Sequence, residues 1–255
     1  APAGVVSATR GNHGQSIALA AARARIPATI YVPRGNSVDQ NSAMRGFGAT
    51  VVEIGDDFDQ AREEAARVAA ERELHFVPSF HADLVRGVAS YALELFAAAE
   101  LDVVYVGIGM GSGICGLLTA RDVLGLRTEI VGVVSEHAPA MALSLAAGRV
   151  VTTPTARTFA DGIATRVPDA RAHAIIARGA AGIVQVAEDD IAEAMRSYFD
   201  DTHHVAEGAG AAPLAALMKE RSRRAGQRVG VILSGGNIER ARYRQVLDGV
   251  TPSVA

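Results

Sequence analysis

A polar stretch near the N-terminus holds residue types that could do chemistry. It runs from Ser7 to Ser16, reads Ser-Ala-Thr-Arg-Gly-Asn-His-Gly-Gln-Ser and follows an apolar strand end. The pattern from Ile17 to Ala24 predicts a helix behind it. At such a strand-to-helix turn, backbone N–H groups and the Asn12 side chain can face a bound anion or ring. An ordinary loop with a turn at Asn and Gly is the alternative interpretation.

A second segment, Gly107 to Gly116, is rich in glycine and lies between an apolar run and a predicted helix. Closely spaced glycines let several backbone amides point at one place, where a phosphate binds well. The pattern Gly111-x-Gly113-x-x-Gly116 also fits a dinucleotide fingerprint, with Glu136 about 20 residues on as the ribose-binding acid. The competing interpretation is a simple phosphate cup. That cup would comprise Gly109, Met110, Gly111, Ser112 and Gly113.

Two later segments repeat this arrangement of small residues after an apolar run or before a helix. Ser234-Gly235-Gly236-Asn237 follows a predicted buried strand, and Glu207 precedes Gly208-Ala209-Gly210 at a predicted helix start. Each has a plain structural explanation, because a carboxylate in a first helical turn is good capping and a Ser-Gly-Gly turn is a common loop. Their order along the chain is more informative than either one alone.

The four segments occur in the order and rough spacing found in the threonine and serine dehydratases. Over nearly its whole length the chain resembles this family of pyridoxal-phosphate (PLP) enzymes of fold type II. The resemblance implies that residues 109–113 hold the cofactor's phosphate, that Asn12 contacts the ring hydroxyl oxygen and that Ser234 bonds the pyridine nitrogen. Glu207 and the stretch Ala160-Asp161-Gly162 would lie near the cofactor. The substrate carboxylate would be faced by Thr9, Arg10 and His13.

The serine expected at the pyridine nitrogen indicates a reaction type. A hydroxyl cannot keep a proton on the ring nitrogen as a carboxylate can, so the ring is a weaker electron sink and suits elimination of a leaving group at Cβ. We therefore expect an ammonia-lyase (dehydratase) that converts threonine or serine to a 2-oxo acid and ammonia. The alternatives are an NAD-dependent oxidoreductase, a non-catalytic binding protein of the PLP fold, or another PLP reaction such as racemisation or elimination from phenylserine or hydroxyaspartate.

The chain departs from the family pattern in three ways. Family members carry PLP as a Schiff base on a lysine upstream of the Ser7 loop, whereas the only lysine here is Lys219, which we expect to be exposed. The Schiff-base lysine is therefore unknown, and because the chain starts with Ala1 we expect it in a preceding segment. Met110 and Ser112 replace glycines that many relatives carry. Arg10 stands where relatives have a small residue, and it could clamp a substrate carboxylate or face solvent.

Composition narrows the class of protein. The 255 residues are 49% hydrophobic with a formal net charge of −3, which gives no basic footprint for nucleic acid. No apolar run has the length of a membrane span, and no metal site is expected. The single cysteine, Cys115, suits a reducing cytoplasm. We expect a cytoplasmic homodimer or homotetramer that acts on a small amino-acid substrate in amino-acid catabolism.

Apolar strands and amphipathic helices alternate along the chain, which predicts an α/β fold of two lobes with mainly parallel sheets flanked by helices. Residues 8–85 form the expected small lobe and residues 86–255 the large lobe, with an N-terminal part of the fold missing. Gly148–Arg166 is expected to be an irregular loop. The predicted strands are Thr29–Val32, Thr50–Ile54, Leu74–Val77, Asp102–Val106, Glu129–Val134 and Arg228–Leu233. The main predicted helices lie at Val38–Gly46, Phe58–Ala69, Leu84–Ala99 and Ile191–Phe199.

Overall fold

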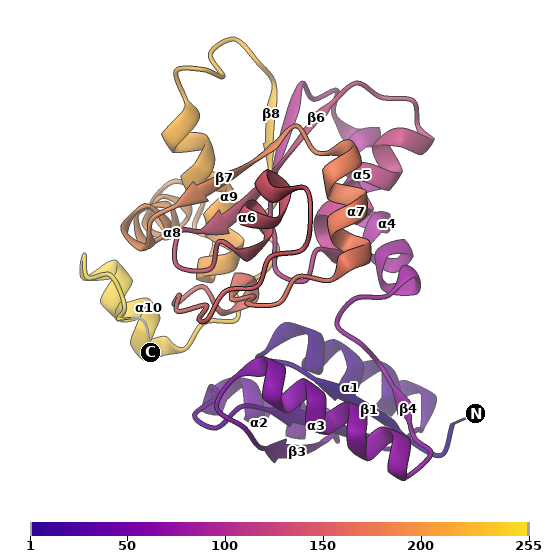
Figure 1. Cartoon of the computed structure of the whole chain (residues 1–255). Coiled ribbons are helices and arrows are strands. Elements are labelled where there is room, and N and C mark those ends of the chain that lie inside the picture. The colour runs from indigo at the N-terminus through magenta and orange to yellow at the C-terminus, as the bar shows by residue number, and fades with distance from the viewer. Residues whose placement is uncertain (1, 254–255) are drawn as a thin grey trace. The chain divides into compact units, whose positions relative to one another are not determined.

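Two separate four-stranded parallel sheets organise the chain, one in each of the units Ala1–Ser79 and Phe80–Ala255 (Figure 1). The computed structural model describes residues 2–253, so Ala1 and the last two residues of the predicted large lobe lie outside the described part. The boundary between the units precedes the predicted one at 85/86. Phe80 and Val85 are both buried in a core of the second unit, which explains the earlier boundary.

The first unit stacks a parallel sheet of order β3-β2-β1-β4 between helices. Side chains alternate between the two faces of each strand, so Tyr31 packs with α3 on one face and Ile30 packs with α1 and α2 on the other. Its strands are β1 (Val5–Ala8), β2 (Ala28–Val32), β3 (Thr50–Glu53) and β4 (His75–Phe76). Its helices are α1 (Asn12–Ala24), α2 (Val38–Gly46) and α3 (Phe58–Glu71).

The second unit repeats this plan on a larger scale, with a parallel sheet of order β7-β6-β5-β8. Its strands are β5 (Val103–Gly107), β6 (Glu129–Ser135), β7 (Gly182–Val186) and β8 (Val229–Val231). Its helices are α4 (Ala82–Ala98), α5 (Ser112–Val123), α6 (Ala140–Ala147), α7 (Ala170–Gly179), α8 (Glu188–Thr202), α9 (Gly208–Glu220) and α10 (Arg240–Leu247), with a 3-10 turn η1 at Asp161–Ile163. The predicted irregular loop is therefore correct up to η1.

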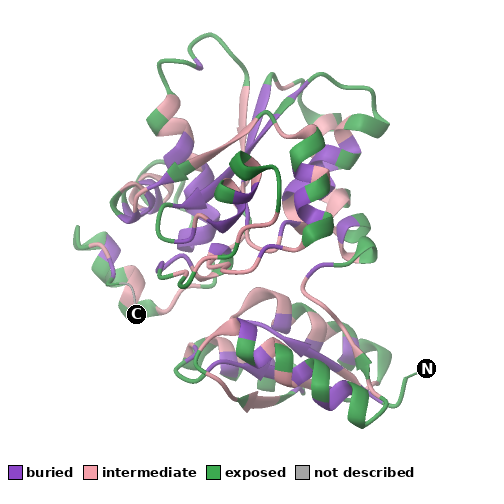
Figure 2. Ribbon diagram, in the orientation of Figure 1, coloured by how far each residue is buried: buried purple, intermediate pink, exposed green. Residues whose placement is uncertain are grey.

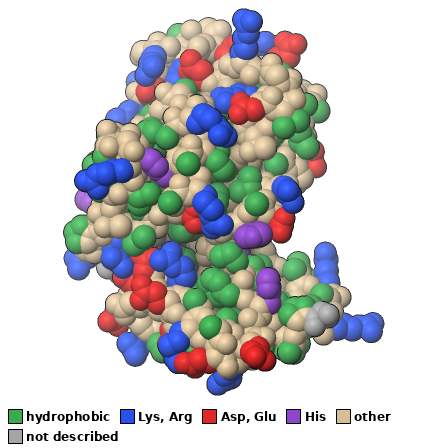
Figure 3. All heavy atoms as spheres, turned by 45° about the vertical axis from the view of Figure 1, so that its right-hand side comes forward, with side chains coloured by type: hydrophobic (Ala, Val, Ile, Leu, Met, Phe, Trp, Pro, Cys, Tyr) green, Lys and Arg blue, Asp and Glu red, His purple; other side chains and the backbone are tan. Residues whose placement is uncertain are grey.

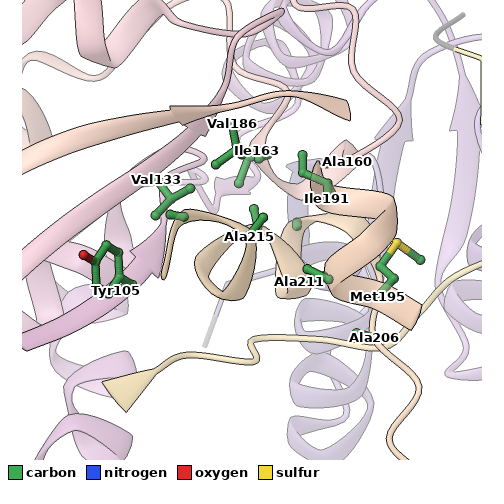
Figure 4. Packing of buried hydrophobic residues seen from close by; sticks show 14 of the residues in the cluster. Tyr105, Val133, Ala160, Ile163, Val186, Ile191, Met195, Ala206, Ala211 and Ala215 are labelled. Atoms are coloured by element: carbon green, nitrogen blue, oxygen red, sulfur yellow. The ribbon is translucent and has the colours of Figure 1, made fainter. Parts of the chain in front are cut away.

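Each face of the second sheet has its own hydrophobic core. Tyr105 and Val133 pack against α8 and α9 on one face (Figure 4). Val104 and Val106 pack against α4, α5 and α7 on the other face. Burial follows the same layering, with the central strands β1, β2, β5 and β6 mostly buried and exposed residues on the outer sides of the helices (Figure 2). Strands covered on both faces read as continuous apolar runs, which is why β5 and β6 could be predicted.

In each sheet the first strand of the unit has later strands on both of its sides, so the strand order reverses there. β1 lies between β2 and β4, and β5 lies between β6 and β8. In open parallel sheets, ligands bind beyond the carboxyl ends of the strands at such a reversal of strand order. The two motifs of highest chemical interest follow β1 and β5 directly.

The surface shows no segregation of charge in the view of Figure 3, where basic and acidic side chains are interspersed. Within residues 2–253, none of the helices combines the length and apolar character needed to cross a membrane.

Candidate functional site

The motif of the first unit forms the turn between β1 and α1. α1 begins at Asn12 rather than at the predicted Ile17, so half of the motif lies in the first helical turn. Thr9 is 4% exposed, and its Oγ1 accepts hydrogen bonds from the amides of Gly11 at 2.9 Å and Gly14 at 3.3 Å. Thr9 therefore stabilises this turn from inside. In its predicted contact with a substrate carboxylate, Thr9 would donate the hydrogen of its own hydroxyl group.

His13 is anchored to the sheet through Ser7. The Ser7 hydroxyl donates to the carbonyl oxygen of Val77 at 2.8 Å, and His13 Nε2 lies 3.2 Å from the same hydroxyl oxygen. Since the Ser7 hydrogen is directed at Val77, His13 Nε2 carries the hydrogen and donates to Ser7. Burial lowers the pKa of His13 below its usual value, so the ring is neutral and its one N–H is engaged. In this structure His13 thus positions the loop, and its contact with a substrate carboxylate stays a prediction.

Arg10 and Asn12 occupy the same turn and are both half-buried. Arg10 directly precedes Gly11, which has no side chain to cap α1, and Thr9 accepts the hydrogen bond from the Gly14 amide instead. The turn thus places a guanidinium and an amide side chain at the carboxyl end of β1.

The glycine-rich segment of the second unit joins β5 to α5 and depends on two glycines. An added Cβ at Gly109 would lie 2.3 Å from the carbonyl oxygen of Gly162. Gly111 has a φ of 100°, a conformation that favours glycine, and no side-chain hydrogen bond caps α5 at this residue. Backbone rather than side chains therefore forms the turn, and the first amides of α5 are available to an anion.

The other predicted segments of this unit lie beside that turn. The amide of Glu207 donates to the carbonyl oxygen of Gly235 at 3.1 Å, which ties the start of α9 to the Ser234-Gly235-Gly236-Asn237 loop. Ser234 is exposed, whereas Glu207 is 9% exposed. A Cβ at Gly162 would lie 2.8 Å from the Ala209 side chain, so η1 packs between the glycine turn and α9.

These contacts bring four predicted segments together at one edge of the second sheet. β5 and β8 are hydrogen-bonded neighbours, with Tyr105 paired to Val231, and each leads into one of the two glycine-containing loops. Adjacent strands lie about 5 Å apart, so amides for a phosphate and the Ser234 hydroxyl emerge side by side. This donor set fits a ligand that has a phosphate and a polar ring atom.

Sequence reasoning missed a buried carboxylate next to this site. Glu188 is 8% exposed and accepts hydrogen bonds from Ser135, Thr158 and the amide of Phe159. It is the first of three consecutive acidic residues at the start of α8, a pattern typical of ordinary helix capping. Nothing in the sequence distinguishes it from its two neighbours.

Lys219 lies away from these segments, as the sequence predicts. It is exposed, and its Nζ donates to the carbonyl oxygen of Gln185 at 2.9 Å. It stands near the end of α9, about 16 Å along the helix from Gly208 at about 1.5 Å per residue. Lys219 therefore has no part in the candidate site.

Comparison with known proteins agrees with this geometry. Residues 1–235 match the family described as "Pyridoxal-phosphate dependent enzyme". The chain is 34% identical over 238 residues to an L-threonine ammonia-lyase of Thermotoga maritima, covering 92% of this chain and 59% of that protein. It is 34% identical over 250 residues to an L-threo-3-hydroxyaspartate ammonia-lyase of a Pseudomonas species, covering 97% of this chain and 78% of that protein. The processed form of threonine deaminase isoform 2 from Solanum lycopersicum superposes with a TM-score of 0.90 at 29% identity, covering 97% of this chain and 73% of that one.

The family match identifies PLP as the cofactor and gives no support to a dinucleotide fingerprint with Glu136 as the ribose-binding acid. The role of residues 109–113 as the phosphate cup stays a prediction. The chain spans 59% of the length of the Thermotoga relative, so the match concerns a large part of such an enzyme. With two parallel sheets, a glycine cup and a Ser-Gly-Gly-Asn loop at one sheet edge, the chain belongs to the pyridoxal-phosphate dependent enzymes of fold type II that include the threonine and serine dehydratases.

Proposed function

We propose that the protein containing this chain is an ammonia-lyase that converts a β-hydroxy amino acid, such as threonine or serine, to a 2-oxo acid and ammonia. The observation that carries the proposal is the meeting of the glycine turn after β5 with the Ser234 loop after β8, in a chain 34% identical to a threonine ammonia-lyase. PLP supplies the electron sink that this elimination requires.

The second unit offers a binding group for each end of that cofactor. We assign the phosphate to the backbone amides of residues 109–113, where the uncapped start of α5 adds a favourable dipole. The Ser234 hydroxyl is assigned to the pyridine nitrogen, with Glu207 near the ring. Within the first unit, Asn12 is the proposed contact of the ring hydroxyl oxygen, and the substrate carboxylate is assigned to Arg10 and the Thr9 hydroxyl.

Serine at position 234 supports elimination over transamination. Its hydroxyl is neutral, so it can share a hydrogen bond with the pyridine nitrogen without holding a full proton there. The ring then withdraws electrons less strongly, which favours rapid loss of a leaving group already present at Cβ. Threonine, serine and hydroxyaspartate all carry such a group.

Hydroxyaspartate is the second candidate substrate. The Pseudomonas relative that acts on L-threo-3-hydroxyaspartate is matched over 97% of this chain. Arg10, where relatives carry a small residue, supplies a cation that could pair with a second carboxylate. A role of Arg10 in binding a second carboxylate would distinguish an enzyme for acidic substrates from an enzyme for threonine.

The test is an assay of the natural protein that contains this chain, supplied with PLP. We expect 2-oxo acid and ammonia in equal amounts from L-threonine, L-serine or L-threo-3-hydroxyaspartate, and a lower rate in Ser234→Ala with PLP at saturation. Racemisation of serine without ammonia release, or no reaction with any β-hydroxy amino acid, would overturn the proposal.

We also propose a cytoplasmic homodimer or homotetramer that acts in amino-acid catabolism. Burial raises the pKa of the Cys115 thiol to about 12, so this cysteine is inert and suits a reducing compartment. Three apolar side chains at the end of α5 and just after it, Val123, Leu124 and Leu126, are 77%, 48% and 39% exposed, which supports association with another copy. Light scattering on the purified protein tests the oligomeric state.

A further inference from the structure

Glu188 is held by neutral donors that come from two different parts of the second unit. Ser135, the last residue of β6, donates its hydroxyl to Oε1 at 2.5 Å. The Thr158 hydroxyl and the Phe159 amide both donate to Oε2 at 3.0 Å. Burying a carboxylate is costly unless it is well hydrogen-bonded, so this arrangement holds α8, β6 and the 158–159 backbone in one geometry.

The segment fixed in this way leads directly into the wall of the glycine turn. Thr158 Oγ1 also accepts a hydrogen bond from the amide of Ala160 at 3.0 Å, which continues the chain of contacts toward η1. Ala160 and Ile163 point into the hydrophobic core beside Ile191 of α8 (Figure 4). Between them, the carbonyl oxygen of Gly162 occupies the space where a Cβ of Gly109 would lie.

We propose that Glu188 is a positioning residue for the phosphate cup, acting through the 158–163 segment on Gly109. The carboxylate sets the position of Thr158 and Phe159, these set η1, and the Gly162 carbonyl packs against the turn whose amides receive the phosphate. The inference rests on the proposed cofactor site for its purpose. The mechanical link itself is a property of the ligand-free chain.

Three variants and one control test the link. Glu188→Ala removes the acceptor for Ser135 as well as for Thr158 and Phe159. Thr158→Val removes only the Thr158 hydroxyl, with little change in side-chain shape. Glu188→Gln keeps an oxygen for Thr158 and Phe159 and offers an N–H to Ser135, so it should rescue most of the effect. Glu193→Gln, an exposed carboxylate on the same helix, is the matched control.

The first readout is amide hydrogen exchange of the ligand-free 255-residue chain. We expect Glu188→Ala to raise exchange across residues 108–113 and 158–163 by roughly tenfold or more, because three hydrogen bonds to a charged acceptor are lost, two of them from Thr158 and Phe159. Thr158→Val should raise it less, and Glu193→Gln should leave it unchanged. A role confined to stability would raise exchange throughout the unit and leave these two segments no more affected than β5 and β6.

The second readout is the Kd for PLP, titrated by its absorbance. Glu188→Ala and Thr158→Val should raise this Kd by roughly tenfold, and Glu188→Gln should restore most of the affinity. If Glu188→Ala does not fold, the exchange rates and the Kd of Thr158→Val and Glu188→Gln test the inference in its place. Folded variants with unchanged exchange at 108–113 and an unchanged Kd would overturn the inference. A wild-type chain that binds no PLP would count against the proposed cofactor site, while the exchange data would still decide the role of Glu188.

Discussion

Single polar side chains near both candidate loops act mainly on the protein's own backbone. Thr9 accepts from two amides at the start of α1, His13 is linked through Ser7 to Val77 after β4, and Glu188 holds the loop leading into η1. The donors left to face a ligand are backbone amides of helix starts. Because such amides have no flexible side chain, their direction depends on these supporting contacts.

His13 gives the first unit a stability that depends on pH. Burial lowers its pKa in the folded state, so below about pH 6.5 the unfolded chain binds a proton that the folded ring rejects. The free energy of unfolding should therefore fall as pH decreases from 6.5, by at most about 1.4 kcal/mol per pH unit for this one group. Urea unfolding between pH 5 and 7.5 should show a shallower slope in His13→Asn. His75→Gln, which changes an exposed histidine of the same unit, should keep the wild-type slope.

Arg10 is expected to bind a carboxylate of the substrate. A charge-assisted hydrogen bond is worth about 1.5–3 kcal/mol, so Arg10→Ala should lower kcat/KM about 10- to 100-fold in the natural protein. Arg10→Lys should recover only part of the loss, because the planar guanidinium is absent. A larger loss with hydroxyaspartate than with threonine would assign Arg10 to the second carboxylate. Equal rates in Arg10→Ala and in the exposed control Arg23→Ala would exclude this role.

At the level of helices and strands, the sequence was most informative about the buried strands and the motifs that follow them. β5 and β6 read as apolar runs because both faces of the sheet are covered, and glycines mark the turn that follows β5. The start of α1 was predicted five residues late, at Ile17 rather than Asn12, because the polar motif residues carry no apolar periodicity. β7 was missed because its residues Gly182–Val186 are mostly half-exposed, so they form no buried apolar run. α6 was missed because its own residues are apolar on nearly all sides, so the sequence shows no polar face.

Tertiary contacts explain the rest of what the sequence could not predict. The buried position of Glu188 depends on Thr158, thirty residues earlier in the chain. The need for glycine at 109 depends on Gly162, and the tautomer of His13 depends on Val77. None of these pairs has a local sequence signal, because each joins segments that lie far apart in the sequence and meet only in the folded chain.

The β5–α5 turn should tolerate a methyl group at Gly113 but not at Gly109. A Cβ at Gly109 would collide with the Gly162 carbonyl, whereas at Gly113 the nearest atoms lie at 3.6 Å. Overpacking of this kind costs about 1–3 kcal/mol, so Gly109→Ala should lower the free energy of unfolding by that amount. Gly113→Ala should change it by no more than about 0.5 kcal/mol. Urea unfolding compares the two, and equal stability would show that η1 yields to the added methyl group.

At the scale of the whole molecule, two units share one design. Each encloses its own hydrophobic cores on the two faces of a parallel sheet, and each carries its polar motif where the strand order reverses. The helix layers leave the ends of the strands open to loops, and the predicted motifs lie at the carboxyl ends. Basic and acidic side chains are interspersed on the face seen in Figure 3.

The chain as a whole should hold PLP without a covalent bond. Its only lysine, Lys219, is exposed and bonded to Gln185 O at the far end of α9 from the site, so the 255-residue chain should bind PLP through polar contacts alone. Binding should then be reversible on dialysis and should raise Tm with the logarithm of the PLP concentration once that concentration exceeds Kd. Borohydride reduction followed by mass spectrometry should find label only on the chain's two kinds of amine, Lys219 and the N-terminal α-amine, in low yield, and Lys219→Arg should remove the label at position 219 without changing the Tm shift. A full equivalent of label at Lys219, together with loss of the Tm shift in Lys219→Arg, would instead place the cofactor at that end of the helix.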